Sequence, residues 1–66
     1  MKLTKGQEMR MIRLLRGMTT EQLAAHIGVS AKTLHRYEND EYKFETAKIL
    51  KCKIYHQENK YLLEDM

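Results

Sequence analysis

MTTEQLAAHIGVSAKTLHRYEN, residues 18–39, is the stretch of this chain that decides its fold. Thr19 is followed three residues later by Gln22, a spacing typical of a capping box at the start of a helix. We therefore predict a helix over residues 20–27. Gly28 is expected to end it, because glycine adopts the left-handed conformation of helix ends without steric cost.

A second helix follows almost at once. Ser30 is a favourable N-cap, and the helix is expected to run from there to Glu38, with Leu34 and Tyr37 on its inward face. Only about three residues link the two helices, so the chain must bend sharply, as in a helix-turn-helix motif. The opposite, outward face carries Ala31, Lys32, His35, Arg36 and Asn39.

An earlier helix is predicted over residues 5–16. Met9 and Ile12 share one of its faces by helical spacing, and Gly17 is placed to end it in the left-handed conformation. Apolar positions beyond that face make the stripe wider than a small core needs. Part of it is therefore expected to pack on the C-terminal segment or on a partner.

The C-terminal part is predicted to hold two more helices, over residues 43–51 and 57–64. The inward positions expected in the first of them are Phe44, Ala47 and Leu50. Proline is absent and the chain has three glycines, which favours helix over strand. The fold class is therefore all-α, with five helices forming a single domain over residues 1–66.

Charge is unevenly distributed along the chain. The net charge is +3, but residues 1–36 hold seven basic and two acidic side chains, whereas residues 37–66 hold five basic and seven acidic ones. A basic half suits a polyanion such as DNA. The same pattern also fits a solvated basic surface, so charge alone does not decide between the two.

Other features indicate the cellular setting. Cys52 is the only cysteine, which excludes an internal disulfide and suggests a reducing compartment. The longest apolar run is far below the ~20 residues that cross a bilayer, and the first residues lack the apolar stretch of a signal peptide. We expect a cytoplasmic protein without membrane contact.

No group of residues has the pattern of an active site. His26, His35, His56 and Cys52 lack zinc-finger spacing, so no metal site is predicted. There is no glycine loop for phosphate, and no serine or cysteine has a histidine in recognisable context. We therefore expect a protein that is not an enzyme and needs no cofactor.

Residues 18–30, together with Leu34, Tyr37, Glu38 and Asn39, resemble the Cro and phage-repressor type of helix-turn-helix, also called the xenobiotic-response-element type. The resemblance covers roughly residues 9–54. It implies a five-helix, lambda-repressor-like domain whose third helix enters the major groove of double-stranded DNA. It also implies a dimeric regulator of transcription, often encoded by a phage or a mobile element.

The resemblance implies roles for individual residues. Those expected at base edges are Ala31, Lys32 and Arg36, with His35 on the same face. Those expected at phosphates are Thr20, Ser30, Thr33 and Asn39. Arg36 is the strongest base contact, because its planar fork can bond O6 and N7 of guanine together. Arg13 and Glu38 are expected to form a structural pair that joins the first helix to the third.

The sequence also departs from that family. Asp40 stands where a glycine usually follows the asparagine, the proline that usually opens the fourth helix is missing, and the segment over residues 39–47 is shorter than usual. Acidic side chains at Asp40 and Glu41 would weaken non-specific binding to phosphates. These departures bear on the placement of the last two helices and on the mode of dimerisation.

The leading hypothesis is a Cro-like repressor that binds a two-fold operator as a homodimer, with the helix over residues 57–64 as the dimer contact. Two alternatives remain open. One is a protein-interaction module on the same fold, such as an antitoxin or anti-repressor, which Asp40 and Glu41 favour mildly. The other is a DNA-bending accessory factor such as an excisionase. Lys32 and Arg36 on the outward face favour DNA.

Overall fold

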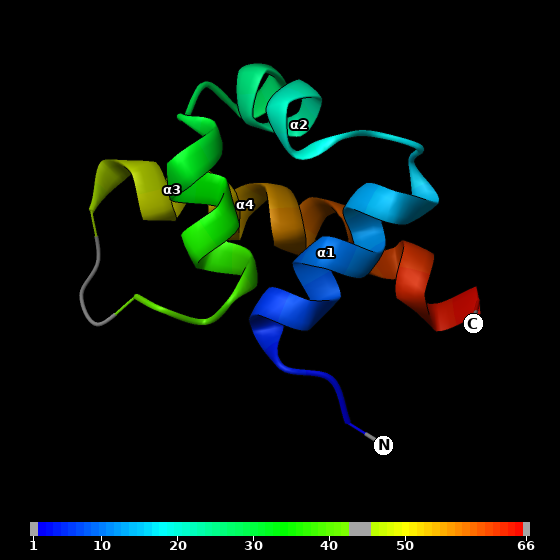
Figure 1. Ribbon diagram of the computed structural model, residues 1–66. Helices are drawn as coiled ribbons and strands as arrows, with labels where there is room; N and C mark the ends of the chain where they lie inside the picture. Colours follow the sequence, from blue (N-terminus) through cyan, green and yellow to red (C-terminus); the bar gives the residue numbers. More distant parts are fainter. Residues whose placement is uncertain (1, 43–45, 66) are drawn as a thin grey trace.

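The structure, a computed structural model, describes residues 2–42 and 46–65. Its regular elements are α1 (Lys5–Leu15), α2 (Thr20–Ile27), α3 (Ala31–Glu38), α4 (Ala47–Asn59) and a 3-10 helix, η1 (Lys60–Asp65) (Figure 1). The all-α class is confirmed. The expectation of five α-helices is not, because the described part of the chain forms four α-helices and one 3-10 helix. None of these helices is long and apolar enough to cross a membrane.

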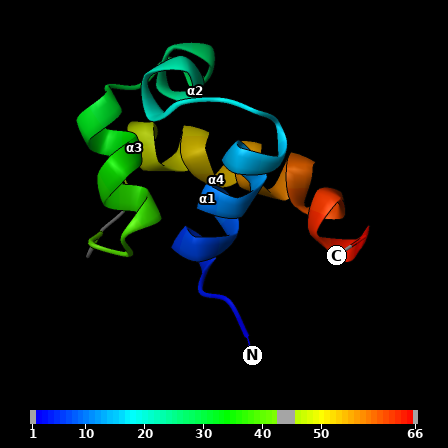
Figure 2. The same cartoon turned by 45° about the vertical axis from the view of Figure 1, so that its right-hand side comes forward.

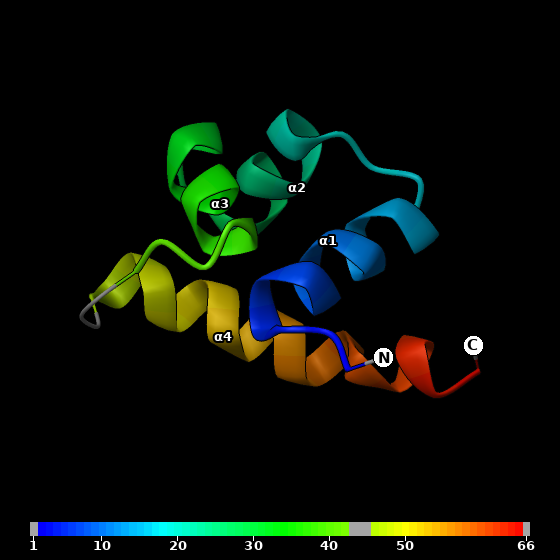
Figure 3. The ribbon, with the colours of Figure 1, turned by 60° about the horizontal axis from the view of Figure 1, so that its bottom comes forward.

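The helices form two layers. Figure 3 shows α4 running along one side of the molecule, with α1, α2 and α3 on the other side. Figure 2 shows α2 and α3 together at the end of the molecule that lies away from the C-terminus. The largest fully buried side chains are Met9, Ile12, Leu23, Leu34 and Cys52, and all of these except Ile12 belong to one core cluster.

The first three helices each begin at an N-cap whose side chain accepts from the N–H of the third helical residue. The Thr19 hydroxyl accepts a hydrogen bond from the Gln22 N–H at 3.1 Å, and the Gln22 side chain accepts one from the Thr19 N–H at 2.9 Å. The predicted capping box of α2 is thus confirmed. The same device starts α1 at Thr4 and Gln7, a pair that the sequence analysis did not single out.

The bend between α2 and α3 is made as predicted. Gly28 has a φ of +88°, in the left-handed region, and ends α2. The Val29 N–H donates to the Ala24 carbonyl at 3.0 Å, which closes the turn. Ser30 then caps α3 by accepting a hydrogen bond from the Thr33 N–H at 3.1 Å. Three residues are therefore enough to turn the chain from one helix into the next.

The predictions for the fourth and fifth helices were wrong in position. The fourth was expected over residues 43–51, but α4 runs over Ala47–Asn59, and the region expected as a fifth helix is split between the end of α4 and η1. The reason is Thr46, whose hydroxyl accepts from the Ile49 N–H at 3.3 Å and so sets the start of α4.

This start also changes which side of α4 faces inward. Ala47 and Leu50, expected in the core, are exposed, and Leu50 keeps 50% of its surface accessible. The buried residues of α4 are Ile49, Cys52, His56 and Asn59. Phe44, the remaining inward prediction, lies outside the described residues.

Asp40 ends α3 in the conformation for which glycine is the usual residue. Its φ is +59°, and its N–H donates to the Tyr37 carbonyl at 3.1 Å. The Asp40 carboxylate accepts hydrogen bonds from the Thr4 hydroxyl at 2.6 Å and from the Gly6 N–H at 2.9 Å. Aspartate tolerates the left-handed region better than most residues. Here its side chain also joins the end of α3 to the start of α1.

Gly6 lies where α1 approaches the end of α3 closely. A Cβ at this position would stand 2.5 Å from the Glu38 carbonyl oxygen and 2.6 Å from that of Tyr37. Both atoms belong to the backbone, so neither can move without shifting α3. The position therefore requires a residue without a side chain.

We expect Gly6→Ala to lower the free energy of unfolding by about 1–3 kcal/mol, the usual cost of overpacking. Urea denaturation followed by circular dichroism measures it. Lys5→Ala is the matched control, because Lys5 is the exposed neighbour in the same first turn and its replacement should change stability by less than about 0.5 kcal/mol. Equal stability of the two variants would contradict this close contact.

Burial also makes the stability of the fold sensitive to alkali. It raises the pKa of Cys52 from 9.0 to about 11, with a smaller effect from the Glu38 charge, and it is the main reason that the pKa of Tyr37 rises from 10.0 to about 12. The unfolded chain loses these protons first. Their contribution to stability is therefore complete below pH 9 and is lost as the pH rises through about 12.

We expect the free energy of unfolding, measured in urea at a series of pH values, to fall above pH 9. In Cys52→Ala, a less stable variant, the fall between pH 9 and 11 should be shallower, because one of the two groups is gone. Parallel pH profiles for the variant and the original chain would show that the thiol does not titrate as described.

Candidate nucleic-acid interface

α3 presents one polar face to solvent. Lys32, His35, Arg36 and Asn39 are exposed, and Ala31 is half-buried at the start of the same face. The opposite side of α3 is anchored by Leu34 and Tyr37, which are 0% and 6% exposed. Two cationic side chains thus lie on the solvent-facing side of a helix whose opposite side packs against the core.

His35 and Asn39 contact each other on this face. The Asn39 Nδ2 atom lies 3.0 Å from His35 Nε2, one turn apart along the helix. An amide nitrogen only donates, so in this arrangement Nε2 accepts and the ring proton stands on Nδ1. Each side chain therefore has one hydrogen-bonding position occupied before any ligand binds.

The hydroxyl residues expected at phosphates lie at or near the starts of α2 and α3. Thr20 is the first residue of α2 and is half-buried. Ser30 is occupied as a cap, since its hydroxyl accepts from the Thr33 N–H and donates to Thr33 Oγ1 at 2.8 Å. The first N–H groups of α3 have no partner within the helix and are suited to an anion.

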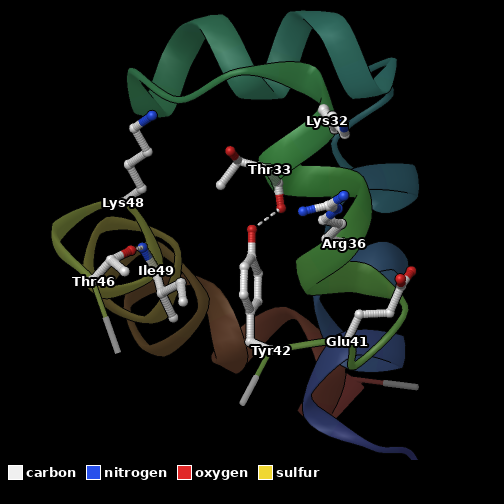
Figure 4. A pocket seen from close by; sticks show the side chains of 8 residues that line it. All are labelled: Lys32, Thr33, Arg36, Glu41, Tyr42, Thr46, Lys48 and Ile49. Atoms are coloured by element: carbon white, nitrogen blue, oxygen red, sulfur yellow. Dashed lines mark hydrogen bonds between the residues drawn. The ribbon is translucent and has the colours of Figure 1, made fainter. Parts of the chain in front are cut away.

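A hollow of about 420 Å³ lies between α3 and the start of α4 (Figure 4). Its lining residues are Lys32, Thr33, Arg36, Glu41, Tyr42, Thr46, Lys48 and Ile49. Tyr42 stands in the middle, and its hydroxyl donates to the Thr33 carbonyl. The hollow extends the cationic face of α3 onto α4.

Besides the apolar Ile49 and the acidic Glu41, three residues that line this hollow were not predicted as site residues: Tyr42, Thr46 and Lys48. The sequence contains a signal for two of them. Thr46 precedes Ile49 by three residues, the spacing of an N-cap, and a helix that starts there places Lys48 in its first turn. Nothing in the local pattern indicates the contact of Tyr42 with α3.

The acidic residues after α3 are separated by the fold. Asp40 directs its carboxylate to Thr4 and Gly6, on the side of α1. Glu41 lines the hollow together with Arg36 (Figure 4). Among the lining residues three are cationic and one is acidic, so the hollow favours a negatively charged ligand.

Arg13 and Glu38 form a two-pronged ion pair between α1 and α3. Arg13 Nε lies 2.9 Å from Glu38 Oε2 and Nη2 lies 3.3 Å from Oε1. Arg13 Nη1 also donates to the Met18 carbonyl at 3.1 Å, in the segment that leads to α2. The guanidinium thus connects three parts of the chain, and its donors point to protein acceptors rather than outward.

Of the histidines and the cysteine, His56 and Cys52 lie one turn apart on the buried side of α4, whereas His26 and His35 are exposed on α2 and α3. His56 Nε2 lies 3.1 Å from Glu8 Oε1, and Cys52 is in the core. No group of three or more histidine, cysteine or acidic residues within residues 2–42 and 46–65 is placed to hold a metal ion.

Comparison with known proteins gives one match. A family model described as a helix-turn-helix domain matches residues 6–52. No curated protein sequence and no solved structure matches the chain. The matched residues include α1 from its second residue, all of α2 and α3, and the first turns of α4. The resemblance carried by residues 18–39 is thereby confirmed at the level of a helix-turn-helix family.

The buried ion pair predicts a stability effect. Arg13→Met should lower the free energy of unfolding by about 3–5 kcal/mol, because it leaves the Glu38 carboxylate buried without a partner. Arg13→Met/Glu38→Leu should be more stable than the single variant. Arg10→Met, which changes an exposed arginine of the same helix, is the control in chemical denaturation. A single variant as stable as the control would mean that the pair contributes nothing.

Proposed function

Because the chain belongs to the helix-turn-helix domain family, we propose that it is a sequence-specific regulator of transcription that inserts α3 into the major groove of double-stranded DNA. Helix-turn-helix proteins contact base edges with the second helix of the motif while the first crosses the backbone. α2 and α3 have the short link and the sharp bend that this arrangement needs.

One observation carries the proposal: Lys32 and Arg36 are exposed on a helix whose opposite side is buried. A helix held only at one edge would lose orientation on binding. α3 is held by its core face, by the Arg13–Glu38 pair and by the Tyr42 hydroxyl, on three different sides. Such a helix presents its outward side chains in a fixed arrangement, which base recognition requires.

Base recognition is assigned to the outward face. Arg36 would bond guanine O6 and N7 together, and Lys32 would reach the same acceptors with less directional preference. The methyl group of Ala31 suits the methyl group of thymine. His35, with its Nδ1–H free in the arrangement described, would donate to a base or phosphate acceptor.

Phosphate contacts are assigned to the edges of this face. Thr20, Thr33 and Asn39 would bond phosphate oxygens, together with the N–H groups that follow Ser30. The hollow adds Lys48, whose position across the hollow from Arg36 and Lys32 suits a phosphate of the same DNA segment. These contacts set the register of the protein on the duplex but carry no sequence information.

We further propose that the protein is a small repressor of the Cro type. Two copies on a two-fold operator would place two α3 helices in successive major grooves, about 34 Å apart. Occupation of a promoter by such a dimer would exclude polymerase sterically. No catalytic step or cofactor is required for this action.

Selection of bound sequences from random duplex DNA tests the proposal. We expect a short two-fold motif, and no enrichment would contradict DNA binding and favour the protein-interaction alternative. A single-sided or tandem motif would favour the accessory-factor alternative instead.

On the selected duplex, Arg36→Ala should weaken binding by about 1–3 kcal/mol and relax one base position. Lys48→Ala should weaken binding to all sequences alike. It should also lower, by about 1, the slope of the logarithm of the binding constant against the logarithm of the salt concentration. Lys60→Ala, which removes an exposed charge from η1, is the control and should leave both quantities unchanged. Equal binding of Arg36→Ala and the control would remove Arg36 from base recognition.

A further inference from the structure

α4 carries two lengthwise rows of residues. The inner row, spaced three, four and three residues apart, is buried and consists of Ile49, Cys52, His56 and Asn59. A second row with the same spacing consists of Ala47, Leu50, Ile54 and Gln57, all of them exposed. Leu50 and Ile54 keep 50% and 48% of their surfaces accessible. We call this second row the outer row.

The outer row is not needed by the fold. A helix at the surface of a small domain needs one buried stripe. The inner row of α4 supplies it with apolar Ile49 and Cys52 and with His56 and Asn59, which form hydrogen bonds within the chain. Apolar residues spaced alternately three and four apart are typical of the narrow seam along which two helices pack. Tyr61, 56% exposed, continues this spacing into η1. The pattern therefore predicts a second helix against α4.

We propose that this second helix is α4 of another copy of the chain, and that the outer row is the contact through which two copies bind DNA together. The inference rests on the proposed function and names the interface that the repressor model needs. It differs from the expectation that the segment over residues 57–64 makes the contact alone, since most of the outer row lies before it.

The orientation of α4 supports a second copy as the occupant. α4 begins beside α3, where Lys48 lines the hollow, and runs away from it toward the C-terminal end (Figures 1 and 3). If two outer rows meet in parallel, the two-fold axis lies along α4. Both α3 helices then stand on the same side of the pair. This arrangement fits a two-fold operator, on which both recognition helices approach the same face of the duplex.

Charges beside the row also favour the parallel arrangement. In a parallel pair, the heptad spacing brings Lys53 of one copy next to Glu58 of the other. In an antiparallel pair, it brings Lys53 opposite Lys60 instead. Lys53 can attract Glu58 of the other copy while it also makes a contact within its own chain.

The size of the outer row indicates how strong this association is. α4 has 13 residues, so at 1.5 Å per residue the row is about 20 Å long and about 10 Å wide. This footprint of a few hundred Å² is below the roughly 800 Å² per partner of a stable interface. The copies should therefore associate weakly in solution and pair on DNA, where binding to adjacent half-sites raises their effective concentration.

The closing experiment compares DNA carrying one half-site with DNA carrying two. Leu50→Glu/Ile54→Glu should bind one half-site like the original chain but lose at least tenfold in affinity for two half-sites, because cooperativity is lost. The control is Leu14→Glu/Leu15→Glu, which changes two residues of similar exposure on α1 and should keep cooperativity. Undiminished cooperativity in the outer-row variant overturns the proposal.

A cross-link tests the orientation. Gln57→Cys should form a disulfide between two copies on two-half-site DNA under mild oxidation, because a parallel pair brings identical positions together. Cys52 is buried and does not interfere. Absence of the cross-link while binding stays cooperative would rule out the parallel contact.

If the original chain binds no duplex DNA, the proposed function fails. The contact through the outer row is then tested in the absence of DNA. Sedimentation at millimolar protein should then show association that the outer-row variant lacks. A chain that stays monomeric at that concentration would overturn the interface as well.

Discussion

The orientation of α3, the helix that carries Lys32 and Arg36, depends on the three-residue turn between α2 and α3. Gly28 adopts a left-handed conformation that ends one helix, and Ser30 caps the next before the chain can extend. With so few residues available, the angle between the two helices is set by backbone geometry rather than by side-chain packing alone. A longer or looser turn would remove one of the constraints that fix the orientation of α3 relative to α2.

The turn orients α3, and other contacts hold it. Leu34 and Tyr37 bury one side of the helix, and the carboxylate of Glu38 is held by Arg13 from α1. Tyr42 approaches from the other flank and donates to the Thr33 carbonyl. The stabilising contacts therefore surround α3 on every side except the one that carries Lys32 and Arg36. A helix that binds in a DNA groove needs this separation between the sides that pack against the protein and the side that contacts DNA.

Particular residues show which parts of the structure can be predicted from the sequence. The starts of α2 and α3 were predicted because Thr19, Gln22 and Ser30 act on their nearest neighbours, and such local chemistry is visible in a sequence. The predicted start of α4 was wrong because it followed the apolar positions Phe44, Ala47 and Leu50, whereas the cap at Thr46 sets the start. The outward face of α3 followed from helical spacing, whereas the hollow did not, since it brings together Lys32 and Lys48 from different helices.

Asp40 was noted in the sequence as a departure from the usual glycine, and the structure gives the departure a purpose. Its carboxylate accepts from Thr4 and Gly6, so the residue that ends α3 also secures the start of α1. In evolutionary terms, positions 4 and 40 form a unit. Relatives with glycine at position 40 would be released from selection for a hydroxyl at position 4. Relatives that keep the aspartate would be expected to keep serine or threonine there, so the two positions should vary together across the lineage.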